Sequence, residues 1–430
     1  MAHSTITSSS LDQNEDPNCA GQQQPYSTIT SSSSSLDQQK NDDPGCAGQH
    51  PPVSPISLDK GDPMIFEEYW ERMGDKCDLR IGGGDLMSYL SNPGGVCWFL
   101  LPQLEESIRR IHSLVGNAAT QGRYIVVGTG SSQLVQTVLY ALSSDSPHPL
   151  SVVCAPPYYS CYPELAGILK SELYKWEGDA HTFNKDGPFL ELVTSPNNPD
   201  GSIRGPVVRP RAGGHVMYDL AYYWPQFTPI THQADHDIMI FTFSKSVGHA
   251  GSRIGWAIVK NKEIAIKMVK LIEVLSIGVS KEAQLRATKI LGAICDGYEG
   301  SLAMPESDKF FDYFRRIMAE RWNKLREVVK KNQVFSLPEY QQEQCLFSEG
   351  LAGTHPGFAW LKCEKGESKD DAEGFLKGYG IQARGGHKFG VDGSFVRVSM
   401  MSRENTFKAF LERLSAIEAG RDSTYKMDVA

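Results

Sequence analysis

The sequence lacks several features that would assign it to a common class of protein. No apolar run approaches the ~18 residues of a transmembrane helix, so we expect no membrane span. Basic residues are not in excess, and the net charge of -8 over 430 residues argues against a broadly basic surface for nucleic acid. The N-terminus, MAHSTITSSS, has neither the charged region nor the apolar core of a secretory signal. The nine cysteines form no CxxC pair, which favours reduced thiols over a disulfide framework or a zinc site.

Large apolar residues are almost missing from residues 1–58. This segment contains a tandem repeat, in which Ser4–Gly21 recurs as Ser27–Gly48. Its Ser/Gln/Asp/Pro-rich composition cannot offset the entropy of ordering a backbone. A plastid transit peptide would be rich in arginine and poor in acids, whereas here acidic residues outnumber the single Lys40. We therefore expect a disordered, acidic, cytoplasmic tail.

The composition becomes ordinary from about Leu58 onward, and short apolar runs rich in β-formers alternate with helical patterns such as Gln133–Leu142. Near-continuous apolar strands separated by helices are typical of a mostly parallel sheet that is covered on both faces. The fold class predicted is therefore α/β. The expected strands are Tyr124–Val127, Ser151–Cys154, Phe189–Thr194, His215–Tyr218 and Ile238–Phe243.

The C-terminal third has a different pattern. Apolar residues at three- and four-residue steps predict a long amphipathic helix over Ser307–Lys330. Phe395–Met400 alternates like a half-buried strand. We expect a large α/β domain at 96–305, an interdomain helix and small α+β domain at 306–430, and an N-terminal arm at 59–95 that forms part of the small domain.

The string SKSVGHAGSRIGW follows a predicted buried strand and places Ser244 and Lys245 at its carboxyl end, with Arg253 eight positions after the lysine. Ligands of open α/β sheets bind beyond the carboxyl ends of strands. A desolvated lysine there has a lowered pKa and can form a Schiff base with a carbonyl group. Arg253 can bind a phosphate, and Ser244 can donate to it. A solvated lysine and a surface arginine are the simpler alternatives for each residue alone, but the whole string favours the functional interpretation.

A second candidate site lies at YIVVGTGSSQL, where a strand, a glycine-bracketed turn and a helix follow one another. Ser131 and Ser132 would lie at the helix N-terminus, where free N–H groups and the helix dipole favour a phosphate. Gln133 occupies the place of the third glycine of GxGxxG, so dinucleotide binding is disfavoured. Taken alone, the segment is equally typical of an ordinary capped helix.

Polar residues also follow two other predicted strands. Asp219 could pair with a protonated heterocycle nitrogen, while Asn198 and Tyr222 could donate to a ring oxygen. The simpler alternatives are an Asn-Pro turn for Asn198 and a loop cap for Asp219. The aromatic segment Pro156–Tyr162 could stack on a planar ring, although its tyrosines could also be core residues.

Together these segments resemble the fold-type I pyridoxal phosphate (PLP) enzymes, the aspartate aminotransferase superfamily. The resemblance extends over nearly the whole chain after the tail and is strongest to the plant tryptophan aminotransferase group, relatives of alliinase. The phrases that carry it include GDPMIFEEYW, DLMSYL, YIVVGTGSSQL, ELVTSPNNPDG, GHAGSRIGWA and FVRVSMMSRE.

The resemblance implies a role for each candidate residue. Lys245 matches the lysine that binds the PLP aldehyde, and Asp219 matches the partner of the pyridinium nitrogen. Asn198 and Tyr222 match the ligands of the ring O3′. The residues that match the phosphate-binding group are Ser131, Ser132, Ser244 and Arg253.

Further matches concern the ring face, the substrate and a second subunit. The ring-stacking position falls at Tyr159, with adjacent Tyr158 as a competitor. Arg397 matches the arginine that holds the substrate α-carboxylate. Tyr89, in DLMSYL, matches the tyrosine that reaches the phosphate of the neighbouring subunit, which implies a homodimer.

The activity implied is that of an L-tryptophan:pyruvate aminotransferase, which makes indole-3-pyruvate for auxin synthesis. The alternatives are an alliinase-like cysteine sulfoxide C–S lyase of the same fold and, more remotely, a non-catalytic PLP-binding scaffold. Alliinases have a Cys-rich EGF-like module before the catalytic region, whereas residues 1–58 here contain only Cys19 and Cys46. This departure favours a cytoplasmic aminotransferase over a secreted or vacuolar lyase.

Overall fold

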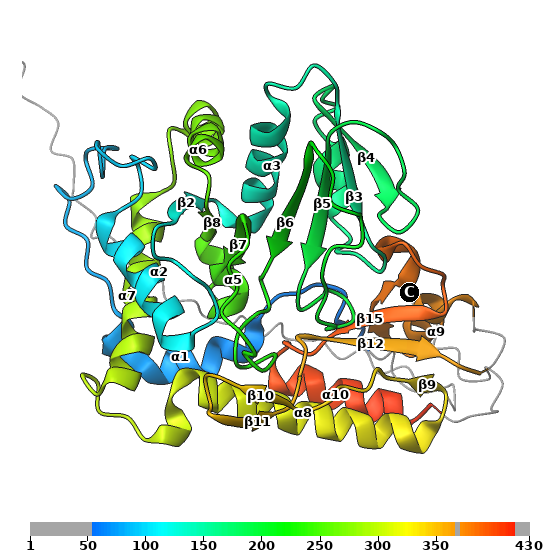
Figure 1. Cartoon of the computed structure of the whole chain (residues 1–430). Helices are drawn as coiled ribbons and strands as arrows, with labels where there is room; N and C mark the ends of the chain where they lie inside the picture. Colours follow the sequence, from blue (N-terminus) through cyan, green and yellow to red (C-terminus); the bar gives the residue numbers. More distant parts are fainter. Residues whose placement is uncertain (1–53, 366–369, 418–430) are drawn as a thin grey trace, which may run out of the picture. The chain divides into compact units, whose positions relative to one another are not determined.

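The computed structural model of the chain describes residues 54–365 and 370–417 (Figure 1). Most of the expected tail, residues 1–53, lies outside the described residues. The tail prediction is wrong for its last residues. The strand β1 (Ile56–Ser57) pairs in parallel with β13 (Ile381–Gln382), and Leu58 is buried. Leu58 belongs to the core and Ile56 packs against it, which explains why these residues are part of the fold.

A seven-stranded sheet forms the centre of the fold, with strand order β2-β8-β7-β6-β5-β3-β4. All neighbours are parallel except β8, which is antiparallel to both β2 and β7. Every residue of β5, β7 and β8 is buried, as expected where both faces of a sheet are covered. All five predicted strands are confirmed. The strands are β2 (Tyr124–Gly128), β3 (Leu150–Cys154), β4 (Tyr174–Asp179), β5 (Phe189–Thr194), β6 (Gly214–Asp219), β7 (Ile238–Thr242) and β8 (Gly255–Val259).

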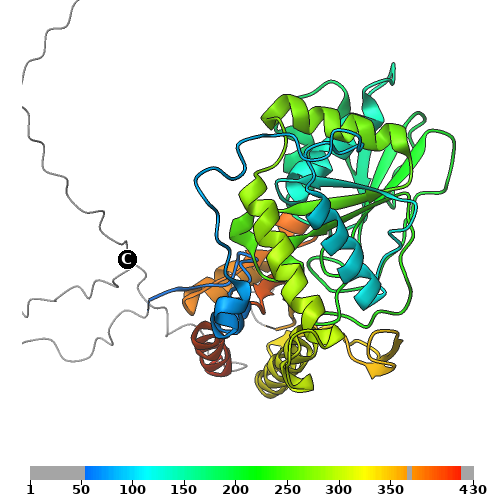
Figure 2. The same ribbon diagram turned by 90° about the vertical axis from the view of Figure 1, so that its left-hand side faces the viewer.

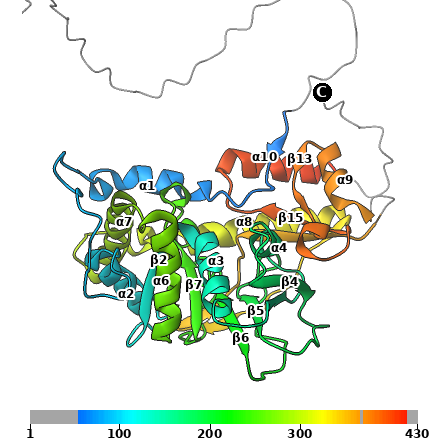
Figure 3. The ribbon, with the colours of Figure 1, turned by 90° about the horizontal axis from the view of Figure 1, so that it is seen from above.

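Helices pack on this sheet and on one another. Figure 3 shows α6 (Lys262–Ser276) and α3 (Gly130–Ser143) side by side in front of β2 and β7, and both helices contact the sheet. The helices α2 (Pro102–Val115) and α7 (Lys281–Glu299) pack against each other. The shorter helices are α1 (Glu67–Met73), α4 (Tyr162–Gly167) and α5 (Phe243–Ser246), and the 3-10 turns are Met64–Phe66, Gly74–Cys77, Ala250–Ser252, Glu306–Asp308 and Gly386–Phe389.

The predicted long helix is α8 (Phe310–Asn332), which begins three residues later than expected because Glu306–Asp308 forms a separate 3-10 turn. Figure 2 shows α8 (olive) and α10 (dark red) at the bottom of the view, below the green strands. A four-stranded sheet has the order β14-β15-β12-β9, and its strand β9 contacts α8. The remaining elements are β9 (Phe335–Ser336), β10 (Glu343–Cys345), β11 (Gly350–Ala352), β12 (Phe358–Cys363), α9 (Ala372–Gly378), β14 (Arg384–Gly385), β15 (Phe395–Ser399) and α10 (Glu404–Ser415). The domain boundaries stay predictions.

The strand β15 corrects the expectation of a half-buried strand at Phe395–Met400. The four residues that follow Phe395 in β15 are all buried. On the face expected to meet solvent, the Arg397 side chain donates to the carbonyl of Asp59, and at the strand edge the Ser399 N–H donates to the carbonyl of Leu58. The early part of the chain thus covers the face that was expected to meet solvent.

Neither a candidate membrane-spanning helix nor a candidate metal site is present in the described residues. Within 54–365 and 370–417, none of the helices is both long and apolar enough to cross a membrane. In the same residues, no group of three His, Cys, Asp or Glu side chains is placed to hold a metal ion. Six cysteines of this part are free thiols, namely Cys77, Cys97, Cys154, Cys161, Cys295 and Cys345.

Candidate active site

The carboxyl ends of three adjacent strands open onto one cavity. Thr194, Asp219 and Thr242 are the last residues of β5, β6 and β7, and all three line a cavity of about 190 Å³. We call it the Lys245 cavity. The structure brings nine of the predicted site residues to its walls, namely Ser131, Ser132, Tyr159, Asn198, Asp219, Tyr222, Ser244, Lys245 and Arg253.

Lys245 lies in the one-turn helix α5, directly after β7. Its surroundings lower the pKa of the amine from 10.5 to about 8, first because burial disfavours the charged form and then because Arg397 and Arg253 add positive charge, against the opposing charge of Asp62. The amine donates to the carbonyl of Gly61. A lysine with this pKa is in part a free amine near neutral pH, which is the form that attacks carbonyls and accepts protons.

Asp219 is the buried carboxylate at the end of β6. Burial raises its pKa, while two hydrogen bonds to its oxygens act in the opposite direction. Tyr162 Oη donates to Oδ2 at 2.9 Å, and the Ala221 N–H donates to Oδ1 at 3.1 Å. Tyr162 was missed as a site residue, because nothing in the aromatic run Pro156–Tyr162 indicates which tyrosine faces the carboxylate.

Arg397 lies beside the cavity rather than on the outer face of β15. Its side chain donates from Nη1 to Asn198 Oδ1 at 2.9 Å and from Nη2 to the Asp59 carbonyl at 2.6 Å. The guanidinium carbon is 4.0 Å from the centre of the Phe358 ring. Arg397 is only 3% exposed, and its Nε has no hydrogen-bond partner within the described residues. Arg397 is therefore a buried side chain rather than a solvated arginine.

An anion-binding group forms one side of the cavity. Ser131 and Ser132 lie in the first turn of α3, whose N-terminus presents free N–H groups. Arg253 Nη1 lies 3.4 Å from Ser244 Oγ and donates to the Ala250 carbonyl at 2.7 Å. Gly130 has a φ of +76°, and a Cβ there would lie 2.5 Å from Arg253 Nη2, so glycine suits both the backbone and the close approach of the arginine. Backbone donors, hydroxyls and a guanidinium together suit a phosphate dianion.

The two candidate stacking tyrosines are separated clearly by the fold. Tyr159 lines the cavity, and its ring lies edge-on to Tyr162 at 5.3 Å between centroids. Tyr158 lies edge-on to Trp176 at 5.2 Å and its N–H donates to the Phe389 carbonyl. Tyr159 is therefore the residue placed to contact a ring in the cavity, and its stacking role stays a prediction.

Tyr89 is the predicted site residue that does not approach the cavity of its own chain. It is 65% exposed and lines a separate groove of about 660 Å³ with Met87, Phe99 and Ile277. Because its predicted role concerns a neighbouring subunit, that role stays a prediction.

Comparisons with known proteins agree with this architecture. The family described as Allinase matches residues 56–418. Tryptophan aminotransferase-related protein 2 of Oryza sativa subsp. japonica is 49% identical over 377 residues, which cover 84% of this chain and 73% of the relative. Tryptophan aminotransferase-related protein 2 of Arabidopsis thaliana is 48% identical over 84% of this chain and 81% of the relative. Alliin lyase of Allium cepa var. aggregatum is 34% identical over 84% of this chain and 81% of the relative.

The solved structures that the chain resembles include an aspartate aminotransferase of Thermus thermophilus. It aligns with a TM-score of 0.57 at 17% identity and covers 85% of this chain and 92% of that structure. An Escherichia coli protein with a methionine aminotransferase function aligns with a TM-score of 0.56 at 15% identity. The alignment covers 84% of this chain and 94% of that structure. These alignments confirm the predicted fold-type I architecture.

Proposed function

Because the chain belongs to the alliinase family and has the fold of PLP-dependent aminotransferases, we propose that it converts L-tryptophan and pyruvate to indole-3-pyruvate and L-alanine. The observation that carries this proposal is the difference in identity between the two kinds of relative. The tryptophan aminotransferase-related proteins of rice and Arabidopsis are 49% and 48% identical to the chain, whereas an onion alliin lyase is 34% identical.

PLP is the cofactor of this family, and the residues of the Lys245 cavity fit it. PLP supplies, when bound, the aldehyde and the electron-withdrawing ring that the reaction requires. Lys245 would hold the aldehyde carbon, and Asp219 would hold the ring nitrogen in its protonated form. Asn198 and Tyr222 would contact the ring O3′. The residues that would hold the phosphate are Ser131, Ser132, Ser244 and Arg253.

The substrate would be oriented by Arg397 and deprotonated by Lys245. Arg397 is fixed on one side by Asn198 and Asp59, and its buried Nε offers a further donor for a carboxylate. The amine of Lys245, with a pKa of about 8, suits a base that takes the proton from the substrate Cα and later returns one.

The lyase remains the second candidate, since an onion alliin lyase matches the chain over 374 residues. The site residues do not separate the two reactions, because both begin with loss of the Cα proton. A silent scaffold is disfavoured, since Lys245 and Asp219 line one cavity and Arg397 donates to Asn198, which lines the same cavity.

We also propose a homodimer in the cytoplasm. Tyr89 lies among exposed apolar side chains, with Met87 83% and Ile277 53% exposed, which supports burial of this surface against a second subunit. The partner's Tyr89 would then add a further contact to the residues that bind the phosphate. The free thiols of the described residues support a reducing compartment.

The experiment that tests the proposed reaction is a panel of amino acids given to the purified enzyme with PLP and pyruvate. Keto acids are then identified by mass spectrometry. Tryptophan should give the highest kcat/KM, and indole-3-pyruvate should be the main product. Equal rates with all aromatic and aliphatic amino acids would contradict the assignment of tryptophan, while no keto acid from any amino acid would contradict an aminotransferase.

A further inference from the structure

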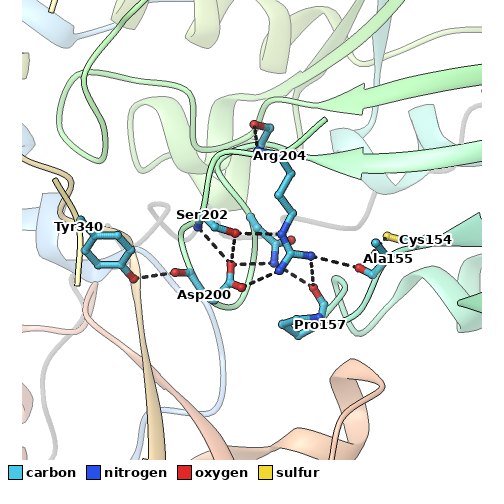
Figure 4. A network of polar contacts seen from close by, with 9 residues as sticks. Cys154, Ala155, Pro157, Asp200, Ser202, Arg204 and Tyr340 are labelled. Carbon is cyan, nitrogen blue, oxygen red and sulfur yellow. Dashed lines mark hydrogen bonds and ion pairs between the residues drawn. The ribbon is translucent and has the colours of Figure 1, made fainter. Parts of the chain in front are cut away.

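Two loops that contribute residues to the Lys245 cavity are joined by a side chain outside it. Residues 195–204 follow β5 and contain Asn198, and residues 155–159 follow β3 and contain Tyr159. Figure 4 shows Arg204 between these loops, with its guanidinium pointing toward the backbone of Ala155 and Pro157. Arg204 is not among the residues that line the cavity.

The guanidinium of Arg204 uses each of its three nitrogens. Nη1 donates to the carbonyls of Ala155 and Pro157 at 3.2 and 3.1 Å. Nη2 donates to Asp200 Oδ2 at 2.6 Å, and Nε donates to Ser202 Oγ at 2.9 Å (Figure 4). The planar fork therefore holds two backbone carbonyls of one loop and two side chains of the other at the same time.

Asp200 closes the loop that contains Asn198. Its Oδ1 accepts from Asn197 Nδ2 at 2.9 Å and from Ser202 Oγ at 2.7 Å. Asn197 Nδ2 also donates to the Pro157 carbonyl at 2.9 Å, so the residue just before Asn198 is tied to the same atom as Arg204. The Asp200–Arg204 ion pair is partly buried, with side chains 16% and 21% exposed. Water therefore screens it less than a surface pair.

The same turn is held from the C-terminal half of the chain. Tyr340 Oη donates to the Asp200 carbonyl at 2.6 Å (Figure 4). Gly201 has a φ of +70°, and a Cβ there would lie 2.1 Å from Pro356 Cγ. The turn is thus fixed on both sides, and Arg204 and Asn197 link it to the Tyr159 loop.

We propose that Arg204 is a positioning residue of the cofactor site, which sets Asn198 and Tyr159 at the distance that suits the PLP ring. The inference rests on the proposed contacts of these two residues with PLP, and not on which amino acid is the substrate. Lysine would keep the positive charge but could not hold both carbonyls and Asp200 together, because its ammonium lacks the fork.

The test compares Arg204→Lys with the wild type in two measurements, the dissociation constant of PLP and the pH midpoint of the visible band of bound PLP. We expect PLP to bind about tenfold more weakly, as for loss of one or two hydrogen bonds. The midpoint should rise, because a displaced Asn198 no longer donates to the ring oxygen, which becomes more basic. The unfolding temperature of the PLP-free protein should change little.

Arg109→Lys is the matched control. Arg109 also donates to two backbone carbonyls, those of Thr120 and Arg123, and pairs with Glu105, but it lies away from the Lys245 cavity. This variant should bind PLP like the wild type.

If Arg204→Lys does not fold, Asp200→Asn serves instead, since it removes the charge of the pair but keeps the shape of the turn. It should show the same weaker binding and the same shift of the band.

The inference is overturned if Arg204→Lys, or Asp200→Asn in its place, keeps wild-type affinity and an unshifted band. It is also overturned if affinity falls only in proportion to the unfolding temperature while the band stays in place. Asn198→Ala and Tyr159→Leu separate this failure from that of the proposed site. If these two variants also bind PLP normally, the proposed contacts of Asn198 and Tyr159 are wrong as well.

Discussion

The hydroxyl of Tyr162 lies 2.9 Å from a carboxylate oxygen of Asp219 and 2.7 Å from the hydroxyl of Thr194. Tyr162 has one proton, so if it donates to Asp219 it must accept from Thr194. All three side chains are buried, where a hydrogen bond to a charged group is stronger than at the surface. The arrangement favours the ionised form of Asp219 against the effect of its burial.

Tyr162→Phe should therefore raise the pKa of Asp219 further above its ordinary value. A protonated Asp219 no longer pairs with a ring nitrogen, so the acid limb of the kcat profile should move to higher pH. The expected loss is about 1–3 kcal/mol of transition-state stabilisation, as for removal of a hydrogen bond to a buried charge. The measurement is the pH profile of kcat, and Tyr223→Phe is the control, because Tyr223 Oη donates to the His232 carbonyl and not to Asp219. A profile identical to the wild type would refute this role.

The depressed pKa of Lys245 gives a prediction about stability as well as activity. The folded-state pKa of about 8 lies below the ordinary 10.5, so burial costs the folded state nothing above pH 10.5 and the full penalty below pH 8. Lys245→Met should abolish turnover and the visible band of lysine-bound PLP. It should also stabilise the PLP-free protein at pH 7, by an amount on the order of 2 kcal/mol, and much less at pH 10.5.

Thermal unfolding of both PLP-free proteins at the two pH values measures this difference. Lys260→Met is a suitable control, since Lys260 pairs with Asp235 at the surface and should show no such gain. Turnover or a wild-type band in Lys245→Met would remove Lys245 from the proposed mechanism.

Arg397→Lys should weaken every amino acid substrate to a similar degree. The guanidinium donates to Asn198 and to the Asp59 carbonyl. The ammonium of lysine cannot make both contacts and also form a bidentate contact with a carboxylate. We expect kcat/KM to fall by a factor that corresponds to about 2–5 kcal/mol of lost transition-state stabilisation, as for a broken buried charge pair. Kinetics with tryptophan and with two further amino acids give the answer. A loss confined to tryptophan would indicate that Arg397 contacts the side chain instead.

Deleting residues 1–53 should leave kcat and the melting temperature nearly unchanged, because this polar repeat offers no apolar face to pack on the fold. A deletion that continues through Leu58 should be strongly destabilising. It removes β1, the buried Leu58 side chain and the Leu58 carbonyl bonded to Ser399. Activity assays and thermal unfolding of the two truncated proteins distinguish these results. A large loss of activity in the shorter deletion would show that the repeat segment acts on the site.

The sequence could place Lys245 and Asp219 at one edge of the sheet, because each lies at the carboxyl end of a predicted strand and parallel strands bring these ends together. Tyr162 could not be chosen from its aromatic neighbours, since a short helix decides which of them faces inward. The contact of Arg397 with the Asp59 carbonyl could not be predicted, because the two residues are more than three hundred positions apart in the chain. Arg204 gave no signal, because its contacts depend on the shape of two loops and not on a motif.

The fate of pyruvate tests the central claim most directly. An aminotransferase consumes pyruvate and forms alanine, whereas a cysteine sulfoxide lyase produces pyruvate and ammonia without an acceptor. We predict that tryptophan and pyruvate give alanine and indole-3-pyruvate in equal amounts, and that S-alkyl cysteine sulfoxides give little pyruvate. Rapid release of pyruvate from the sulfoxides, with tryptophan inert, would contradict the aminotransferase and establish the lyase.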